Sequence, residues 1–321
     1  MRYVEVGGAR MSVIGLGTWQ FGSREWGYGS EYAERDAVDI TQRALDLGIN
    51  LLDTAEIYAF GRSERIVGRA IKDRRTDAFV ATKVFPIFPL APIVEQRARA
   101  SAARLGVDQI DLYQVHWPNP VVPLATTMQG MAHLVEKGTV RHVGVSNFGL
   151  GQWKSAERML GGPVLTNQVQ YSLVTRKPER DLLPYAAAEG RVVIAYSPLA
   201  QGFLSGRYDG TNTPGGVRAG NAMFLPGNIE KAKPLLDALR AVAAAHDATP
   251  AQIALAWVIR RPNVVAIPGA SSVAQLEKNV AAAEIELTDD EDARLTETSD
   301  AFNPTTGLNA VPHLLRARLR R

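Results

Sequence analysis

The sequence contains no cysteine among its 321 residues. This absence excludes disulfide bonds, thiolate nucleophiles and cysteine-bound metal ions together. Only five histidines are present, and none belongs to a His-Glu-x-x-His run, which argues against a catalytic zinc ion. We therefore expect a functional site without a metal.

Long apolar runs and a strong charge imbalance are also missing. No apolar run approaches the ~20 residues needed to cross a bilayer, and residues 1–8 contain no apolar signal segment. The net charge is only +3, so no global field predicts a nucleic-acid or membrane partner. The arginine-rich stretch 316–321 is a local exception, which we interpret as a solvated helix end. We expect a cytoplasmic protein and leave its oligomeric state open.

An apolar content of 46% and a charged content of 21% are typical of a globular protein. Residues 2–6 and 10–13 flank Gly7-Gly8-Ala9 and predict a two-stranded hairpin. Eight strand-like runs rich in β-branched residues follow, at 14–19, 49–53, 78–84, 110–116, 140–146, 165–171, 192–197 and 264–268.

Helical patterns alternate with these runs. Three of them, at 33–47, 124–137 and 181–189, end just before a glycine, which is a helix C-cap signature. Eight strand–helix units predict an α/β fold with a parallel sheet closed into a (β/α)8 TIM barrel. An open doubly wound sheet is the alternative, but residues 15–19 supply only two of the three glycines that its dinucleotide motif needs.

Three segments extend this pattern within a single predicted domain. Residues 201–229 are rich in glycine, proline and asparagine and are predicted to form a long lid loop after the seventh barrel strand. Helices are predicted at 230–246 and 250–260, and a capping box at 288–291 begins a further helix over 288–299. The resulting boundaries are a hairpin at 1–13, a barrel at 14–283, and a C-terminal helix with a basic tail at 284–321.

Polar or amphipathic side chains end nearly every predicted strand. In a barrel the carboxyl ends of the strands form the active face. The residues at these ends are Trp19, Asp53 with Tyr58, Lys83, His116 with Trp117, Ser146 with Asn147, Gln168, Tyr196 with Ser197, and Gly269 with Ser271.

Lys83 is the most informative of these residues. It lies in a strand whose burial makes an unpaired ammonium costly, and Asp53 is its natural partner. A cation beside Tyr58 favours the phenolate and lowers its pKa, and His116 adds a group that can hydrogen-bond a substrate oxygen. Taken singly, the ion pair and His116 could equally be structural, and Asp53 and Tyr58 could be a helix cap and a surface aromatic.

Six segments carry a resemblance to the aldo-keto reductases. They are residues 52–58, 81–83, 112–117, 144–148, 167–171 and 196–199, and they match the signatures of that family in order and spacing. The resemblance extends from Gly15 to about Asn279. Residues 269–272 with Gln275 and Asn279 are similar to the branch that contains potassium-channel beta subunits and bacterial general reductases.

The resemblance implies NADPH-dependent reduction of a small aldehyde or ketone to an alcohol, with NADH as a possible substitute. It implies that Tyr58 protonates the carbonyl oxygen, that Lys83 lowers the Tyr58 pKa, that Asp53 holds Lys83, and that His116 orients the carbonyl. The alternative is a redox-sensing module that binds NADP(H) and turns over slowly. An unrelated phosphate-binding barrel enzyme is a third possibility.

The same resemblance implies a set of cofactor contacts along the barrel rim. They are Thr18, Trp19, Asp53, Ser146, Asn147, Gln168, Tyr196, Ser197, Pro198, Leu199, Gln201, Gly202, Arg207, Arg218, Gly269, Ser271, Gln275 and Asn279. Reductases of aldose type carry Lys and Arg after the last strand, and this sequence lacks them. Arg207 and Arg218 are therefore expected to bind the 2′-phosphate. Ala59 replaces a glycine found after the tyrosine in many relatives, which questions the conformation of residues 59–61.

Aromatic residues near the rim predict an apolar pocket for aromatic or medium-chain carbonyl compounds. For Trp26 and Phe224, packing within loops is the alternative. The predicted pocket consists of Trp19, Trp26, Tyr58, Phe60, Phe85, His116, Trp117 and Phe224.

Overall fold

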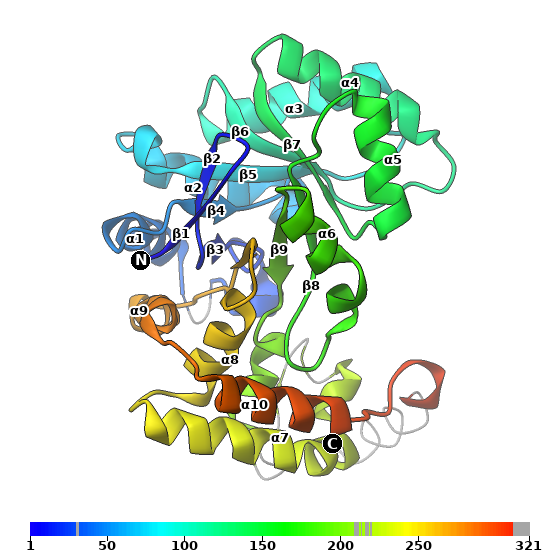
Figure 1. Ribbon diagram of the computed structural model, residues 1–321. Coiled ribbons are helices and arrows are strands. Elements are labelled where there is room, and N and C mark those ends of the chain that lie inside the picture. The colour runs from blue at the N-terminus through cyan, green and yellow to red at the C-terminus, as the bar shows by residue number, and fades with distance from the viewer. Residues whose placement is uncertain (30–31, 209–211, 213, 216–217, 219, 311–321) are drawn as a thin grey trace.

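The computed structural model describes residues 1–29, 32–208, 212, 214–215, 218 and 220–310. Eight parallel strands form one sheet in the order β10-β9-β8-β7-β6-β5-β4-β3, which is the reverse of their order in the chain. Figure 1 shows the helices arranged outside this sheet. The strands are β3 (Leu16–Gly17), β4 (Leu51–Asp53), β5 (Phe79–Val84), β6 (Ile110–Val115), β7 (Val140–Ser146), β8 (Thr166–Gln170), β9 (Val192–Tyr196) and β10 (Val264–Ala266).

The two edges of the sheet meet at a seam. Parallel bridges join Ile14 to Ala266 and Gly17 to Gly269, so the first and last strands are linked. A Cβ on Gly17 would lie 2.6 Å from the carbonyl oxygen of Ile267, closer than real Cβ contacts, so the close approach requires glycine. The predicted barrel and all eight strands are confirmed, with ends that shift by up to two residues.

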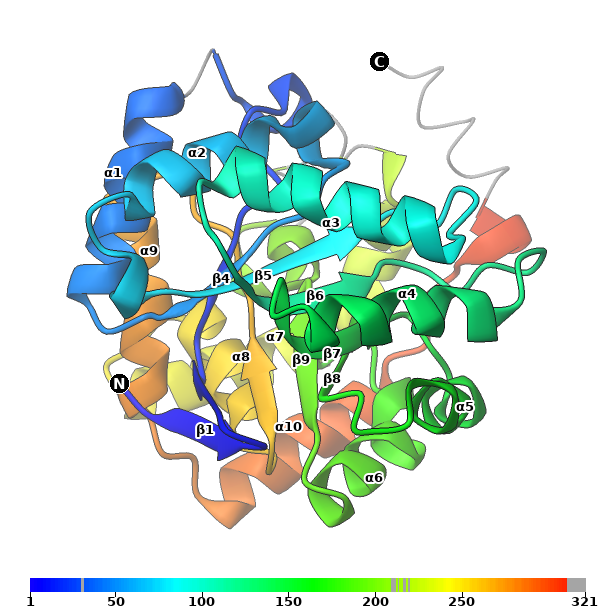
Figure 2. The ribbon, with the colours of Figure 1, turned by 90° about the horizontal axis from the view of Figure 1, so that it is seen from above.

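A helix follows each barrel strand and packs on the outside (Figure 2). The predicted glycines after three of these helices, Gly48, Gly138 and Gly190, all have positive φ, as a left-handed C-cap requires. The barrel helices are α1 (Glu34–Asp46), α2 (Arg62–Ile71), α3 (Ala91–Leu105), α4 (Leu124–Glu136), α5 (Leu150–Leu160), α6 (Leu182–Ala188), α8 (Pro250–Ile259) and α9 (Val273–Ala281).

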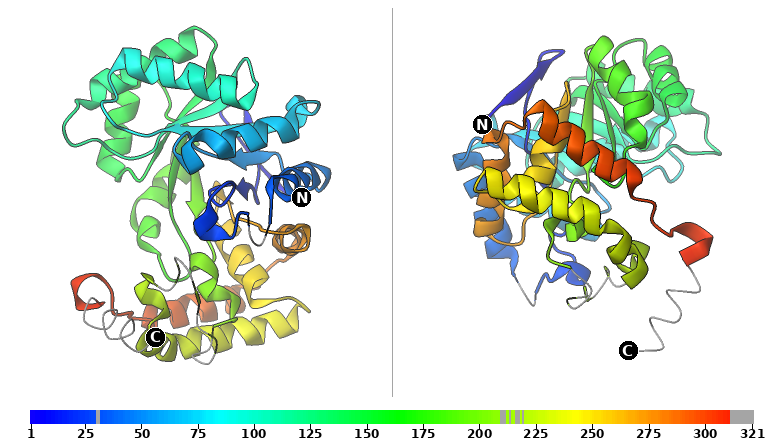
Figure 3. Two further views of the ribbon diagram at one scale, coloured as in Figure 1. Left: turned by 180° about the vertical axis from the view of Figure 1, so that it is seen from behind. Right: turned by 60° about the horizontal axis from the view of Figure 1, so that its bottom comes forward.

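Two further helices, α7 (Pro226–Ala245) and α10 (Asp289–Ala301), lie side by side along one flank of the barrel (Figure 3). The Thr288 hydroxyl accepts from the Glu291 backbone N–H and the Glu291 carboxylate accepts from the Thr288 N–H, so the predicted capping box is confirmed. Helix α7 begins at Pro226, four residues before the predicted start at 230, because proline is well suited to the first turn of a helix.

The predicted lid segment 201–229 is only partly a loop. It contains the short 3-10 helices Ala200–Ser205 and Ala222–Phe224 as well as the first turn of α7, while residues 209–211, 213, 216–217 and 219 lie outside the described ranges. The basic stretch 316–321 also lies outside them. Within the described residues, no helix combines the length and apolarity needed to cross a membrane.

Two apolar clusters build the interior. The larger one lies between the helices and the outer faces of the strands. The smaller one fills the barrel with inward residues such as Leu51, Leu112 and Ile194, together with Met11 from the hairpin β1 (Tyr3–Val6) and β2 (Ala9–Ser12). Because alternate residues of a strand face opposite ways, β5 directs Thr82 outward and Lys83 toward the barrel axis. Lys83 is therefore a charged side chain that points into the barrel from the carboxyl end of its strand.

Candidate active site

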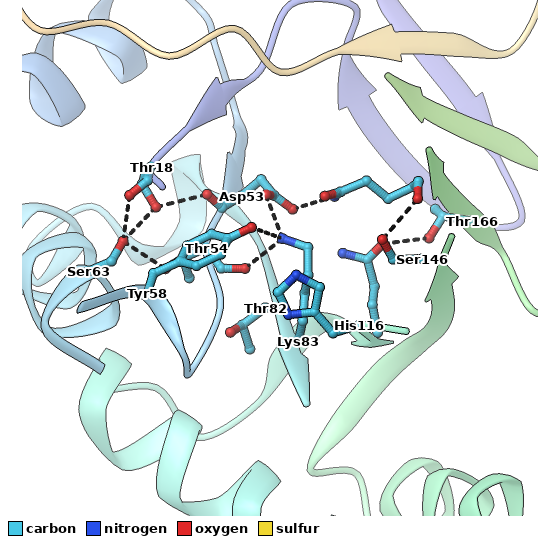
Figure 4. A network of polar contacts seen from close by, with 12 residues as sticks. Thr18, Asp53, Thr54, Tyr58, Ser63, Thr82, Lys83, His116, Ser146 and Thr166 are labelled. Carbon is cyan, nitrogen blue, oxygen red and sulfur yellow. Dashed lines mark hydrogen bonds and ion pairs between the residues drawn. The ribbon is translucent and has the colours of Figure 1, made fainter. Parts of the chain in front are cut away.

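Lys83 lies at the centre of a polar cluster at the carboxyl ends of β4 and β5 (Figure 4). Its side chain is fully buried, and its Nζ donates to Asp53 Oδ1 at 2.6 Å, to the Thr54 carbonyl oxygen at 2.9 Å and to the Tyr58 hydroxyl at 3.3 Å. An ammonium can donate three hydrogen bonds, so Lys83 is fully satisfied without water. The predicted Lys83–Asp53 pair and its contact with Tyr58 are therefore present.

The pKa values of Lys83 and Tyr58 both lie above their ordinary values. Burial opposes the charge on Lys83, but Asp53 and Tyr58 together outweigh it and raise the Lys83 pKa. For Tyr58, burial raises the pKa, Lys83 lowers it, and Asp53 raises it. The expectation that Lys83 lowers the Tyr58 pKa is correct for that single interaction but wrong for the net shift, because desolvation of the phenolate is larger. Tyr58 therefore carries its proton at neutral pH.

His116 follows β6 and lies beside Tyr58. Their ring centroids are 5.8 Å apart and the rings are nearly perpendicular. Phe85 also packs edge-on against His116, with the ring centroids 6.0 Å apart. Burial, followed by the charge of Lys83, lowers the pKa of His116 to about 3. The imidazole is therefore neutral at physiological pH and can donate one hydrogen bond without carrying a charge.

Asp53 is held from two further directions. Gln168 Nε2 in β8 donates to its second oxygen, Oδ2, at 2.7 Å. Below it, a chain of buried hydroxyls connects three elements: Thr54 donates to Ser63, Ser63 to the Thr18 carbonyl, and Thr18 to the Asp53 carbonyl. Thr18 has no exposed surface, and its predicted contact with the cofactor remains a prediction. Its role is to support Asp53 from behind.

The rim beside the cluster carries three of the predicted amide and phenol groups. Asn147 Nδ2 donates to the His116 carbonyl at 3.2 Å and to Ser146 Oγ at 3.0 Å, while Asn147 Oδ1 accepts from the Tyr196 hydroxyl at 3.0 Å. The Ser146 hydroxyl donates to the Gln168 carbonyl at 2.9 Å. The structure thus brings Ser146, Asn147, Gln168 and Tyr196 together at the ends of β7, β8 and β9.

The turn after β9 contains a group of residues with left-handed backbone. Ser197, Ala200 and Gln201 have φ values of 50°, 48° and 60°, and Gly202 follows with 93°. Such backbone is typical of anion-binding nests, in which successive N–H groups point into a concavity. Pro198 is buried in the turn, and the Leu199 carbonyl accepts from the Gly202 N–H.

The two arginines assigned to the 2′-phosphate lie in the segment beyond this turn. Arg218 Nε donates to the Gln201 carbonyl at 3.1 Å, which brings its guanidinium to the turn. Arg207 is exposed, and its carbonyl accepts from Asn212. Arg218 is therefore the better placed of the two.

The predicted contacts after β10 divide into exposed and structural residues. Ser271 and Gln275 are exposed at the start of α9, where the Ser271 hydroxyl donates to Gln275 Oε1. Gly269 packs against Gln20 and its carbonyl accepts from Asn279, which is 4% exposed. Asn279 thus fixes the loop before α9.

The residues predicted to line the substrate pocket differ in their exposure and in their neighbours. Trp19 is 50% exposed with its ring 6.5 Å from that of Tyr58, and Trp117 is 44% exposed and stacked on His116. Phe60 is 94% exposed at the same rim. Phe224 instead packs edge-on against Phe203 and Tyr208 in the core, which corresponds to the loop-packing alternative.

The side chain of Trp26 lies outside the described part of the structure. Ala59, where many relatives have glycine, adopts a left-handed conformation with φ 47° and ψ 42°. This conformation is one that glycine adopts more readily.

Sequence reasoning missed the residues that support the cluster. Ser63 and Glu64 in the first turn of α2 are fully buried, and Glu56 forms an ion pair with Arg97 of α3. Arg104 of α3 likewise pairs with Glu64. A signal was available in the sequence, because Glu56 lies within the 52–58 motif and Arg97 and Arg104 are seven residues apart, on the same face of α3.

Comparison with known proteins agrees with this geometry. The model of the Aldo/keto reductase family matches residues 13–300. An uncharacterized oxidoreductase of Mycobacterium tuberculosis is 52% identical over 322 residues, covering 100% of both chains. The NADH-specific methylglyoxal reductase of Escherichia coli is 32% identical, covering 91% of this chain and 96% of the relative.

The crystal structure of an aldo/keto reductase from Klebsiella pneumoniae in complex with NADP and acetate is similar with a TM-score of 0.75. It is 30% identical and the match covers 95% of this chain and 96% of that one. The barrel, the polar cluster and these similarities show that the chain belongs to the aldo/keto reductase family of oxidoreductases.

Proposed function

We propose that the protein reduces aldehydes and ketones to alcohols with a nicotinamide dinucleotide, and that Tyr58 supplies the proton. The observation that carries this proposal is the contact between the Tyr58 hydroxyl and Lys83 Nζ at 3.3 Å, beside a neutral His116. A protonated phenol next to a buried ammonium can release its proton because the developing phenolate gains a charge partner.

The rim fits such a cofactor. Asn147 and Gln168 carry amides that match a carboxamide, Tyr196 offers an aromatic face, and the left-handed turn after β9 suits a pyrophosphate. The dinucleotide, when bound, supplies a hydride to the carbonyl carbon and is thereby oxidised. The chain's own residues hold the carbonyl and deliver the proton to its oxygen.

The proton step involves three side chains. The O–H bond of Tyr58 breaks as a new O–H bond forms on the substrate oxygen, and the electron pair remains on the phenolate. Lys83 stabilises that phenolate, while Asp53 keeps Lys83 charged and in place. The neutral His116 is placed to donate a hydrogen bond to the same substrate oxygen, which fixes the direction of approach.

We propose NADPH as the preferred cofactor, with Arg218 and Arg207 binding the 2′-phosphate. Arg218 already reaches the turn after β9, and arginine binds phosphate with two parallel hydrogen bonds. The Klebsiella pneumoniae structure contains NADP, whereas the Escherichia coli relative is NADH-specific, so both choices occur among similar proteins.

The substrate class that we propose is aromatic or medium-chain carbonyl compounds. Trp19, Trp117 and Phe85 surround Tyr58 and His116 with aromatic surface, part of which is exposed. An apolar ring around one hydrogen-bonding centre favours substrates with an apolar body and a single carbonyl.

The test is NADPH oxidation with 4-nitrobenzaldehyde and methylglyoxal in the wild type and in Tyr58→Phe. We expect the variant to lose turnover by at least a hundredfold, in line with the loss of a general acid, while NADPH binding, measured by fluorescence, is retained. Tyr113→Phe is the matched control, since the buried Tyr113 hydroxyl has no hydrogen-bond partner among the described residues. Wild-type binding of NADPH without turnover of any carbonyl would contradict the proposal.

A further inference from the structure

Glu56 lies two residues before Tyr58 in the loop that leaves β4. Its carboxylate Oε1 accepts the backbone N–H of Phe85 at 2.5 Å, and its own N–H donates to the Lys83 carbonyl at 3.4 Å. Glu56 therefore connects the loop that contains Tyr58 to the carboxyl end of β5, the strand that carries Lys83. Its side chain is 10% exposed, so these contacts are made away from solvent.

Arg97 of α3 completes this connection. Its Nε donates to Glu56 Oε2 at 3.0 Å and its Nη2 donates to Oε1, which gives the fork geometry of a bidentate pair. Its Nη1 donates to the Phe85 carbonyl at 2.6 Å and to the Ile87 carbonyl at 3.3 Å. Arg97 is 25% exposed, and all three of its nitrogens are used.

The pair therefore fixes both backbone polar groups of Phe85. Glu56 holds its N–H and Arg97 holds its carbonyl. The Phe85 ring in turn packs edge-on against His116 at 6.0 Å. Three of the four polar residues of the site are thus reached from this pair: Tyr58 and Lys83 through the backbone of Glu56, and His116 through Phe85.

We propose that Glu56 is a positioning residue, which through Arg97 keeps Tyr58, Lys83 and His116 in register for proton transfer. The inference rests on the proposed function and adds to it a residue that contacts neither substrate nor cofactor. Misplacement of a reacting group by about 1 Å can cost a hundredfold in rate, so a clamp of this kind acts on catalysis rather than on binding.

The chain contains a matched pair at the other end of the same strand. Asp111 Oδ2 accepts the Val80 N–H at 2.9 Å and pairs with Arg75 Nη2 at 2.6 Å. Arg75 also donates to the Ala78 and Gln109 carbonyls, as Arg97 does to Phe85 and Ile87. Asp111 is 3% exposed. The two pairs hold a backbone N–H of β5 in the same way, although Asp111 Oδ1 also pairs with Arg141 at 3.4 Å, and Asp111 lies at the end remote from Tyr58.

The experiment compares Glu56→Gln with Asp111→Asn in the full-length protein. Both variants keep an acceptor oxygen for the strand N–H and remove the charge that binds the arginine. We expect both to lower the melting temperature. Only Glu56→Gln should lower kcat, by about ten- to a hundredfold, with the dissociation constant of NADPH unchanged within about twofold. Arg97→Lys, which keeps the charge but not the fork, should reproduce the kcat loss, and the double variant should be no worse than Glu56→Gln alone.

A second readout does not require turnover. The Cζ resonance of ¹³C-labelled tyrosine follows the protonation of each phenol, and Tyr58→Phe identifies the signal of Tyr58. If Glu56 no longer positions the loop, Tyr58 moves away from Lys83. The titration of the Tyr58 phenol should therefore shift to higher pH in Glu56→Gln and stay unchanged in Asp111→Asn. A Glu56→Gln protein with wild-type kcat and wild-type Tyr58 titration overturns the inference. Equal kcat losses in both variants overturn it as well, because they indicate general destabilisation.

The two proposals remain distinguishable. If the wild type turns over no carbonyl, the proposed function fails, and the tyrosine titration alone decides whether Glu56 positions Tyr58. If the wild type is active and Glu56→Gln matches it in both readouts, the inference alone fails.

Discussion

Gln168 donates a hydrogen bond of 2.7 Å to Asp53 Oδ2, while Lys83 occupies Oδ1 of the same carboxylate at 2.6 Å. Both oxygens of a carboxylate that is 3% exposed are therefore satisfied by side chains from two other strands. Gln168 also lies on the part of the barrel rim that we assign to the carboxamide of the nicotinamide cofactor. It physically links the proposed cofactor site to the residues that hold Tyr58, the proposed proton donor.

Gln168→Leu should destabilise the protein by about 1–3 kcal/mol, because a buried carboxylate oxygen loses its donor. It should also weaken NADPH binding. Urea unfolding and cofactor titration measure the two effects. Gln114→Leu is the control inside the same barrel, since Gln114 Nε2 has no partner among the described residues and its Oε1 accepts a long bond of 3.3 Å from the Thr166 hydroxyl. Gln114→Leu should lower the free energy of unfolding clearly less than Gln168→Leu does. Equal losses of stability in the two variants would contradict the role given to Gln168.

Lys83→Met should abolish turnover and destabilise the protein by about 3–5 kcal/mol, because it leaves Asp53 as an uncompensated buried charge. Adding Asp53→Asn removes that charge and should restore much of the stability without restoring activity. Denaturant unfolding and NADPH oxidation together measure this separation. A double variant that is as unstable as Lys83→Met would show that the penalty does not come from the buried charge.

The acid sensitivity of the fold should depend on His116. Its pKa is lowered to about 3 in the folded protein, so the folded state binds this proton less tightly than the unfolded state. The contribution of His116 to the free energy of unfolding is therefore complete above the pKa of this histidine in the unfolded chain, near 6.5. That contribution is lost as the pH falls toward 3. Between pH 7 and pH 5 the wild type should lose up to about 2 kcal/mol more than His116→Gln. Urea unfolding at both pH values tests this, and identical losses would contradict it.

Cofactor preference should respond to the two arginines unequally. Arg218→Ala should reduce the ratio of kcat/KM for NADPH over NADH more than Arg207→Ala, because Arg218 reaches the turn after β9 through the Gln201 carbonyl. The NADH value should remain nearly constant, since only the 2′-phosphate is lost as a partner. A wild type with equal efficiency for both cofactors, or variants with an unchanged ratio, would refute this assignment.

The strands and the four catalytic candidates were predictable because strand burial and strand ends leave a strong pattern in the sequence. Lys83 stood out as a charge in a buried run, and its partner Asp53 ended the preceding strand. The supporting contacts were not predictable in the same way. Gln168 reaches Asp53 across the barrel axis, and the bond depends on how strands far apart in the chain are tilted and closed.

Two further differences have physical reasons of their own. The sign of the net Tyr58 shift depends on how burial compares with the Lys83 charge, and a sequence gives the partners but not the desolvation. Phe224 looked like a pocket residue because core and pocket aromatics share one composition, and only its contacts with Phe203 and Tyr208 distinguish them.

The seam of the barrel has a consequence for folding. Ile14 pairs with Ala266, so the first barrel strand cannot complete its pairing until the last barrel strand has been made. The strands that carry Asp53 and Lys83, and the strand that precedes His116, can pair with their neighbours long before that point. The sheet nevertheless keeps two open edges until β10 emerges. Open edges promote association with other chains, and closing so long a loop is entropically slow. The growing chain can therefore bring its candidate catalytic residues together early, but the open edges stay available for association with other chains until the last barrel strand is made.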